Sequence, residues 1–369
     1  MTSRTRTLAR SAAVLLALTA LAALTACTSG TAATKDTSVA ASSTTLRAAA
    51  GKFGLKVGVA VNTDRLDDPA YAQLTGDEFS TVTPENAMKW GLVEPTEGTY
   101  DWTAADKLVA FAQAHGQLVR GHNLVWYQQL PTWLTDAAPK MSAAQLSAIL
   151  KAHITAEVTH FKGEIWQWDV VNEAFDDNGE LRNDIWLEKL GPGYIADAFR
   201  WAHEADPAAK LFLNDYGIED AGIKASAEYA FVQDLKSQGV PIDGVGFETH
   251  LDATYAAPDL ETQLAKFAGL GLDVAVTEAD VRDQLPVSKA DVATQSDIFA
   301  QTMQACVDVP QCISYTVWDL DDKDSWIPQT FSGEGAATLY DDSLKPKPQF
   351  TAVQKVLVKA EKSAPQRSK

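Results

Sequence analysis

Short apolar runs alternate with amphipathic segments from about residue 47 to residue 362. Runs rich in branched and aromatic residues predict strands, and apolar residues spaced three or four apart predict helices. The predicted strands are 55–62, 79–83, 118–126, 166–173, 210–216, 242–250, 272–279 and 313–319. The predicted helices are 103–115, 141–160, 193–205, 224–239, 258–270, 289–307 and 347–361.

This alternation of strands and helices predicts a parallel sheet. Eight strands over roughly 315 residues fit an α/β fold of the (β/α)8 TIM-barrel type, although a doubly wound open sheet has the same alternation. Polar residues collect after nearly every predicted strand, at the end where barrel enzymes carry their active sites, and this favours the barrel. We therefore expect one catalytic domain over 47–362 and a tail over 363–369.

The first 46 residues have a different composition. Three arginines in the first ten residues precede an uncharged apolar run, 11–26, which is short for a membrane span and typical of a signal peptide. The run ends in LTAC, which resembles the bacterial lipobox, so we expect residues 1–26 to be removed and Cys27 to be lipidated. An ordinary signal with an incidental cysteine is the alternative. Residues 27–46 are rich in Ser, Thr and Ala and predict a flexible tether.

These features predict an exported protein that is anchored by lipid to the outer face of the bacterial cell membrane, with partial secretion as a variant. We expect it to be a monomer, although the sequence contains no signal for oligomeric state. The net charge of −18 disfavours nucleic acid as a partner. If Cys27 carries lipid, Cys306 and Cys312 remain, and they either pair as a disulfide or stay as buried thiols. Metal-binding, phosphate-loop and serine-nucleophile motifs do not occur, so we expect no catalytic metal and no cofactor.

Two strand-end glutamates carry the chemistry that the sequence suggests. Glu173 ends the apolar run in WQWDVVNEAF, and Glu278 occupies the equivalent place in LDVAVTEADV. Glycosidic bond cleavage needs one carboxylic acid to protonate the leaving oxygen and a second carboxylate at the anomeric carbon. Asp280 lies on the same strand face as Glu278 and could orient His250, which would help to keep Glu278 ionised. Each glutamate alone could also be a solvated strand-end carboxylate.

Several motifs resemble glycoside hydrolase family 10, the xylanases with the larger barrel. They are TVTPENAMKW (81–90), RGHNLVWYQQLP (120–131), WDVVNEAF (168–175), NDYGIED (214–220), GVGFETHL (244–251), VTEADV (276–281), CVDVPQC (306–312), YTVWDLDDKDSWIP (315–328) and KPKPQF (345–350). The resemblance covers nearly all of 48–360. It implies a retaining endo-1,4-β-xylanase that acts on xylan or another β-linked saccharide, with Glu173 as acid/base and Glu278 as nucleophile.

The resemblance also implies roles for other residues. His250 and Asp280 would support the nucleophile, and Cys306 and Cys312 would form a disulfide that is common in the family. The residues expected to bind substrate are Glu85, Asn86, Lys89, His122, Trp126, Gln129, Asn172, Tyr216, Glu248, His250, Trp318 and Trp326.

The chain departs from the family pattern at four positions. Glu248 stands where Gln is usual, Tyr127 replaces His, Asp319 replaces Gly and Asp324 replaces Tyr. A carboxylate at Glu248 close to Glu278 would raise the pKa of one of the two, so we expect Glu248 to be protonated or hydrogen-bonded and the pH optimum to be acidic. The departures leave another β-linked glycoside open as substrate. A non-catalytic sugar-binding lipoprotein is disfavoured, because both glutamates are present.

Overall fold

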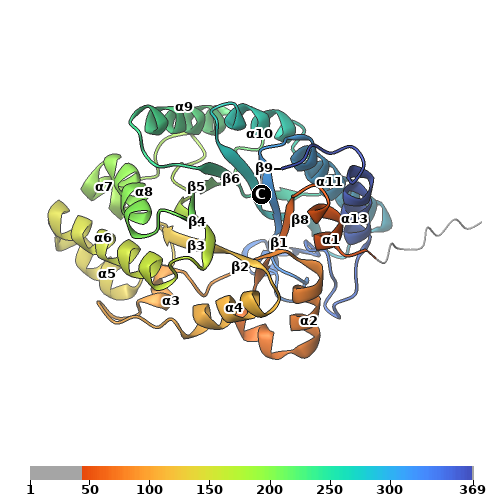
Figure 1. Ribbon diagram of the computed structural model, residues 1–369, viewed down its shortest axis with the longest axis horizontal. Helices are drawn as coiled ribbons and strands as arrows, with labels where there is room; N and C mark the ends of the chain where they lie inside the picture. Colours follow the sequence, from red (N-terminus) through yellow and green to blue (C-terminus); the bar gives the residue numbers. More distant parts are fainter. Residues whose placement is uncertain (1–43, 368–369) are drawn as a thin grey trace, which may run out of the picture. The chain divides into compact units, whose positions relative to one another are not determined.

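Eight strands pair side by side and close into a barrel in the computed structural model, which describes residues 44–367 (Figure 1). The barrel strands are β1 (Lys56–Val61), β2 (Thr81–Pro84), β3 (Leu118–Val125), β4 (Ile165–Asn172), β5 (Lys210–Asp215), β6 (Gly244–Phe247), β8 (Asp273–Gln284) and β9 (Cys312–Val317). All neighbours run parallel, and β9 pairs with both β8 and β1. The predicted (β/α)8 barrel is therefore confirmed, and the open sheet is excluded.

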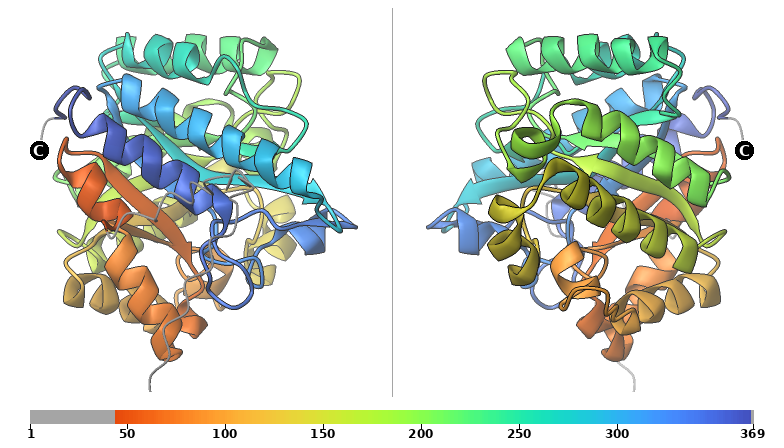
Figure 2. Two further views of the ribbon diagram at one scale, coloured as in Figure 1. Left: turned by 90° about the vertical axis from the view of Figure 1, so that its right-hand side faces the viewer. Right: turned by 90° about the vertical axis from the view of Figure 1, so that its left-hand side faces the viewer.

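Helices cover the outside of this barrel (Figure 1). The longer ones are α2 (Pro69–Glu78), α4 (Thr103–Ala114), α6 (Ala143–His160), α8 (Gly193–Ala205), α9 (Ile223–Ser237), α10 (Leu260–Ala268), α11 (Lys289–Asp308) and α13 (Pro348–Ala360). Figure 2 shows α11 and α13 packed side by side. The pattern predicted seven of these helices but not α2, which is only ten residues long and has two large apolar side chains, Tyr71 and Leu74. Its start is defined instead by Asp68, which caps the amide of Ala70, and by Pro69.

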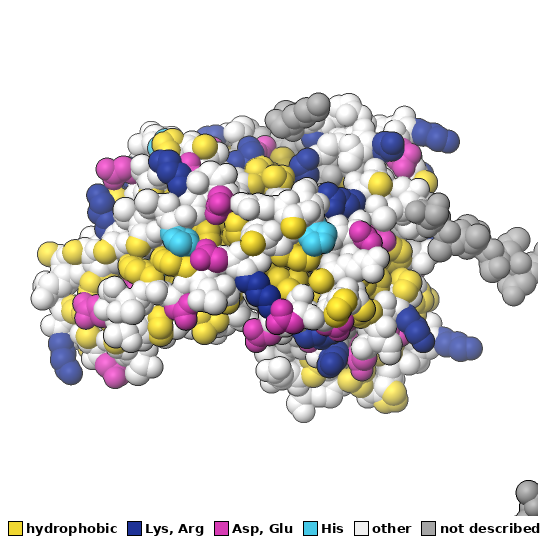
Figure 3. Space-filling model, turned by 60° about the horizontal axis from the view of Figure 1, so that its bottom comes forward, with side chains coloured by type: hydrophobic (Ala, Val, Ile, Leu, Met, Phe, Trp, Pro, Cys, Tyr) yellow, Lys and Arg dark blue, Asp and Glu magenta, His cyan; other side chains and the backbone are white. Residues whose placement is uncertain are grey.

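Short elements connect the barrel units. They are α1 (Leu46–Gly51), η1 (Thr63–Asp67), α3 (Trp90–Val93), α5 (Thr132–Ala137), η2 (Ala138–Lys140), α7 (Ile185–Leu190), α12 (Ile327–Thr330), β7 (His250–Asp252) and β10 (Glu334–Gly335). No helix among residues 44–367 is both long and apolar enough to span a membrane. Figure 3 shows one face of the molecule, where hydrophobic side chains emerge between acidic and basic ones.

The strands are buried along almost their whole length, and this explains their nearly continuous apolar runs. Every residue of β2 and β9 is buried, since helices cover the outer face and side chains fill the interior. Packing inside the barrel is tight at Gly121 of β3, where an added Cβ would lie 2.2 Å from the ring of Trp168. A larger residue at this position would therefore displace Trp168 from the core.

The predicted strand 242–250 is divided in two. β6 ends at Phe247 and β7 begins at His250, because Thr249 adopts a left-handed backbone conformation with φ of 65°. The amide of Thr249 is satisfied by Oε1 of Glu219, at 2.8 Å. The neighbouring strand β8 runs five residues past its predicted end and pairs with β7 and β10. This break places Glu248 and His250 beside the continuation of β8.

The described chain is ordered further at both ends than its composition predicts. Leu46, the last residue assigned to the tether, is the first residue of α1 and is fully buried. Arg367, assigned to the tail, is 6% exposed and donates to the carbonyls of Cys306 and Cys312 at 2.7 and 2.6 Å. These two cysteines form a disulfide. The predicted signal peptide, Cys27 and most of the predicted tether lie outside the described residues.

Candidate active site

A cavity of about 760 Å³ lies at the C-terminal ends of the barrel strands. It is lined by both predicted catalytic residues and by every residue predicted to bind substrate: Glu85, Asn86, Lys89, His122, Trp126, Gln129, Asn172, Glu173, Tyr216, Glu248, His250, Glu278, Trp318 and Trp326. Asp280 lies behind this lining and contacts it through His250. Further lining residues, for which no role was predicted, are Gln128, Gly217, Glu219, Asp220, Leu251, Tyr255, Arg282, Gln329, Thr330 and Phe331.

Glu173 follows directly after β4 and adopts a left-handed backbone conformation, with φ of 53°. Its amide donates to the carbonyl of Asn214 at 2.8 Å, and its carbonyl accepts from Nε of Arg182 at 3.0 Å. Burial, together with the charges of Asp215 and Glu278, raises the pKa of Glu173 to about 7. Near neutral pH this carboxyl group can therefore hold a proton and deliver it.

Glu278 lies on β8 and is 4% exposed. Its Oε1 accepts from Nη2 of Arg120 at 3.1 Å, and its Oε2 lies 3.4 Å from Nε2 of His250. Burial alone would raise the pKa of Glu278, but His122, His250 and Arg120 outweigh it and hold the pKa well below its usual value. Glu278 is therefore the ionised partner of the two glutamates, as a nucleophile must be.

Arg120 of β3 is a buried support of Glu278 that the sequence analysis did not recognise. Its guanidinium donates to Oδ2 of Asp169 at 2.8 Å, to the carbonyl of Thr277 at 2.6 Å and to Glu278. Nδ1 of His122 lies 2.9 Å from the same Asp169 oxygen. The available signal was a pair of charged residues inside predicted barrel strands, because such charges are buried only when they are paired.

Asn214, at the end of β5, begins the motif NDYGIED, but no role was predicted for it. Its Nδ2 lies 2.9 Å from Glu278 Oε1, 3.1 Å from Glu248 Oε1 and 2.8 Å from Asn172 Oδ1. Its Oδ1 accepts from the hydroxyl of Thr277, which fixes the orientation of the amide. Asn214 therefore connects Glu248 to the nucleophile through one amide group.

Glu248 and His250 adjoin Glu278 from the end of β6 and from β7. Burial, then the charges of Glu278 and Glu173, raise the pKa of Glu248 well above its usual value, in the direction expected from the sequence. Burial would lower the pKa of His250, but Asp280, whose Oδ2 lies 2.8 Å from Nδ1, and Glu278 outweigh it and raise the pKa. Both shifts favour the protonated forms of Glu248 and His250, beside a Glu278 whose pKa is held low.

A polar and aromatic wall extends from the catalytic pair. Asn86 donates to Glu85 at 2.8 Å and accepts from Nζ of Lys89 at 3.1 Å. The same ammonium lies 5.0 Å from the ring centroid of Trp126 and 6.0 Å from that of Trp318. Flat rings beside hydrogen-bonding groups suit sugar rings, which have apolar faces and hydroxyl edges.

Asp319 and Asp324, two of the departures from the family pattern, both lie close enough to Glu85 of this wall to interact with its charge. Asp324 forms a close ion pair with Arg65, which also lies 3.6 Å from Asp321. Asp319 is 1% exposed and has a φ of 72°, the conformation for which glycine is usual. Burial and the charges of Glu85 and Asp280 raise the pKa of Asp319 well above its usual value. Asp324 thus has a cationic partner, whereas the surroundings of Asp319 favour its protonated form.

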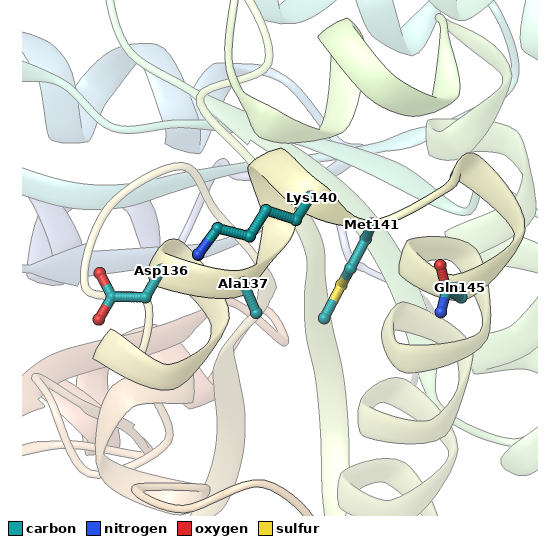
Figure 4. Close-up of a pocket in the computed structure, with 5 residues that line it drawn as sticks. All are labelled: Asp136, Ala137, Lys140, Met141 and Gln145. Carbon is teal, nitrogen blue, oxygen red and sulfur yellow. The ribbon is translucent and has the colours of Figure 1, made fainter.

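A second, smaller cavity of about 400 Å³ lies on the surface where η2 leads into α6 (Figure 4). It is lined by Asp136, Ala137, Lys140, Met141 and Gln145. None of these residues contributes to the large cavity, and their side chains do not converge on one point in Figure 4. We assign no chemistry to this cavity.

A proton-bearing glutamate and an ionised glutamate on one barrel-end cavity define a glycoside hydrolase with two catalytic carboxyl groups. Residues 45–356 match the family described as glycosyl hydrolase family 10. The chain belongs to this family, so the fold and enzyme class predicted from the sequence are confirmed.

Several proteins named as xylanases align with most of the chain. Endo-1,4-beta-xylanase C of Phanerodontia chrysosporium is 43% identical over 319 residues, which are 86% of this chain and 79% of the relative. Xylanase 10B of Thermotoga maritima has a TM-score of 0.83 at 40% identity, over 86% of this chain and 99% of that one. Xylanase 10B of Thermotoga petrophila RKU-1, solved in complex with xylobiose, has a TM-score of 0.84 at 39% identity, over 87% and 99%.

Proposed function

We propose that this protein is a retaining endo-1,4-β-xylanase that hydrolyses internal bonds of xylan or xylo-oligosaccharides. The observation that carries the proposal is the opposite ionisation of Glu173 and Glu278 within one cavity. The pKa of Glu173 is raised to about 7, whereas that of Glu278 is held low. The xylanases among the relatives and the xylobiose complex support the choice of substrate.

The reaction proceeds in two steps. Glu278 attacks the anomeric carbon while Glu173 donates its proton to the departing oxygen, which leaves a glycosyl ester on Glu278. Esterification removes the negative charge of Glu278, which is one of the causes of the raised pKa of Glu173. The pKa of Glu173 therefore falls, and its carboxylate accepts a proton from the water that attacks the ester. Hydrolysis releases the sugar with its original anomeric configuration and returns both glutamates to their starting states.

The test is product analysis on xylan, xylo-oligosaccharides and an aryl cellobioside, with the anomer followed by NMR. We expect short xylo-oligosaccharides from xylan, the β-anomer as the first product, and no turnover by Glu278→Ala. The α-anomer as first product would rule out retention. Release of only terminal xylose would rule out endo action.

A related glycosidase acting on another β-linked glycoside is the second candidate. It is favoured by Glu248 and Tyr127, which line the cavity where the family usually has Gln and His. The same experiment separates the two candidates, because a higher kcat/KM on the aryl cellobioside than on xylo-oligosaccharides would select the second. A sugar-binding protein without catalysis would bind xylo-oligosaccharides but release no product from any of these substrates.

We propose in addition that the protein is an exported monomer, lipidated at Cys27 and anchored to the outer face of the cell membrane. The support is the apolar run 11–26 followed by LTAC, which lies outside the described residues. Incorporation of labelled fatty acid should be lost in Cys27→Ala, and this variant should appear in the medium. Recovery of the unmodified protein in the medium without any label would contradict lipidation, and sedimentation analysis tests the monomer.

A further inference from the structure

Three metal-ligating atoms converge beside the nucleophile. They are Oε2 of Glu248, Nε2 of His250 and Oε2 of Glu278, contributed from the end of β6, from β7 and from β8. The histidine nitrogen lies 3.7 Å from the Glu248 oxygen and 3.4 Å from the Glu278 oxygen. All three residues offer donor atoms within 4.8 Å of one another.

The opposite ends of the same side chains are held in place by other groups. Oε1 of Glu248 and Oε1 of Glu278 both accept from Nδ2 of Asn214. Nδ1 of His250 contacts Asp280 at 2.8 Å, and Oδ2 of Asp280 also accepts from Nε1 of Trp326. A carboxylate on the far nitrogen of a histidine is the usual outer-shell partner in zinc sites, where it fixes the ring and increases its basicity.

A neighbouring convergence shows what makes this one different. His122, Asp169 and Glu278 also bring three donor atoms together, but the guanidinium of Arg120 already contacts Asp169 and Glu278 there. Among residues 44–367, Glu248 forms its ion pair with His250 alone. The cluster around His122 thus already contains the permanent positive charge of Arg120. In the cluster around Glu248, the positive charge belongs to His250, which can release its proton.

We propose that Glu248, His250 and Glu278 form a binding site for a divalent cation of the zinc class, which inhibits the enzyme by capturing its nucleophile. Zinc bonds of about 2.0–2.2 Å in tetrahedral geometry separate ligand atoms by about 3.4 Å, close to the two measured distances. One imidazole and two carboxylates form a mixed ligand set that suits this class of ion. The fourth position faces the cavity and takes a water molecule.

The site depends on Glu248, a residue that distinguishes this chain from most of the family. The family usually has Gln at this position, and an amide offers the ion no negative charge. Binding releases protons to the solvent, because Nε2 of His250 and the carboxyl group of Glu248 must both be deprotonated before they can coordinate. The ion then neutralises Glu278 and blocks its attack, so metal binding and catalysis exclude each other. The inference needs only these side chains and does not depend on which glycoside is the substrate.

The test is calorimetric titration of the EDTA-treated protein with ZnCl2 near neutral pH, with Co2+ as a visible-spectrum probe. We expect one ion per chain at micromolar affinity, a tetrahedral Co2+ spectrum, and inhibition of hydrolysis that is competitive with substrate. Glu248→Gln should weaken Zn2+ binding at least about tenfold. Glu173→Ala is the matched control, since it removes a carboxyl group from the same cavity and leaves the three ligands in place.

Equal Zn2+ affinity in the wild type and Glu248→Gln would overturn the proposal, and so would weaker binding in Glu173→Ala than in Glu248→Gln. Absence of binding to the folded wild type would do the same. Circular dichroism establishes that each variant is folded before the titration. Because calorimetry needs no turnover, a failure of the proposed xylanase activity leaves this test fully decisive.

Discussion

Nε of Arg182 donates to the backbone carbonyl of Glu173 at 3.0 Å, and so fixes the acid/base from the side of its main chain. The contact is needed because Glu173 has a φ of 53°, a conformation that is unfavourable for a residue with a side chain. The guanidinium also lies 4.3 Å from the ring centroid of Tyr127 and donates to the hydroxyl of Tyr216 at 3.0 Å. Arg182 is therefore a positioning residue for Glu173, braced by two tyrosines of the cavity wall.

Substitutions of Arg182 should distinguish its effect on the position of Glu173 from the effect of its charge on the pKa of Glu173. Arg182→Gln should lower kcat by about 10- to 100-fold, because a small displacement of an acid/base is costly. It should also move the basic limb of the pH–rate profile to higher pH, because Arg182 lowers the pKa of Glu173 and its removal lets that pKa rise. Arg182→Lys keeps the charge, so it should lower kcat but leave the limb in place. Arg200→Gln, which changes an exposed arginine of α8, is the control.

The pKa of Glu173 predicts the alkaline side of the wild-type profile. The general acid must be protonated, and a pKa raised to about 7 leaves it increasingly ionised at higher pH. We expect kcat/KM for xylotetraose to fall as the pH rises through about 7. Glu173→Ala should retain its first step only on an aryl xylobioside whose leaving group needs no proton. A wild-type profile that stays flat to pH 9 would contradict this assignment.

Arg120→Gln should affect stability and the acidic limb together. Loss of the guanidinium leaves Asp169 buried without its charged partner, which should lower the free energy of unfolding by about 3–5 kcal/mol. Arg120 also helps to hold the pKa of Glu278 low, and its removal lets this pKa rise. The acidic limb of the pH profile should therefore move to higher pH in the variant. Urea denaturation and a pH profile of kcat/KM measure the two effects. An unchanged acidic limb in a folded variant would exclude Arg120 as a support of the nucleophile.

The strands could be predicted because burial on both faces gives each of them its own local signal, and the polar residues at their ends favoured the barrel over the open sheet. Predicted strand 118–126 and observed β3, Leu118–Val125, differ by one residue. Thr249 could not be foreseen as a break, because its conformation depends on Glu219, which is 30 residues away in sequence. The left-handed φ of Glu173 could not be predicted for the same reason, because the groups that bond to its backbone come from β5 and from Arg182.

The supports of the nucleophile show a second limit of sequence reasoning. Arg120 contacts Asp169 and Glu278 across 49 and 158 residues of sequence, and hydrophobic periodicity contains no information about such pairs. Strand-end residues could be predicted to meet because parallel strands bring their C-terminal ends to one rim. Residues within the strands meet only after the barrel has closed and set the register between them.

Arg367 should stabilise the folded chain although it lies far from the cavity. Its guanidinium donates to the carbonyls of Cys306, Val307 and Cys312, beside the disulfide. Arg367→Ala leaves these buried acceptors without donors, so we expect a loss of about 1–3 kcal/mol and a lower Tm with unchanged kcat. Lys362→Ala, at an exposed position of the same segment, is the control. Equal Tm values for the two variants would contradict the role of Arg367.

The amide of Arg367 also donates to the carbonyl of Phe53, and Nε2 of Gln354 donates to the carbonyl of Thr44, so the first and last segments of the described chain pack against each other. Such proximity permits circular permutation. A linker from residue 367 back to residue 44 would keep the barrel continuous, and new ends could be opened in a loop at the cavity rim. A fusion partner would then emerge next to the saccharide, which would convert this hydrolase into a scaffold for coupling two saccharide-processing activities.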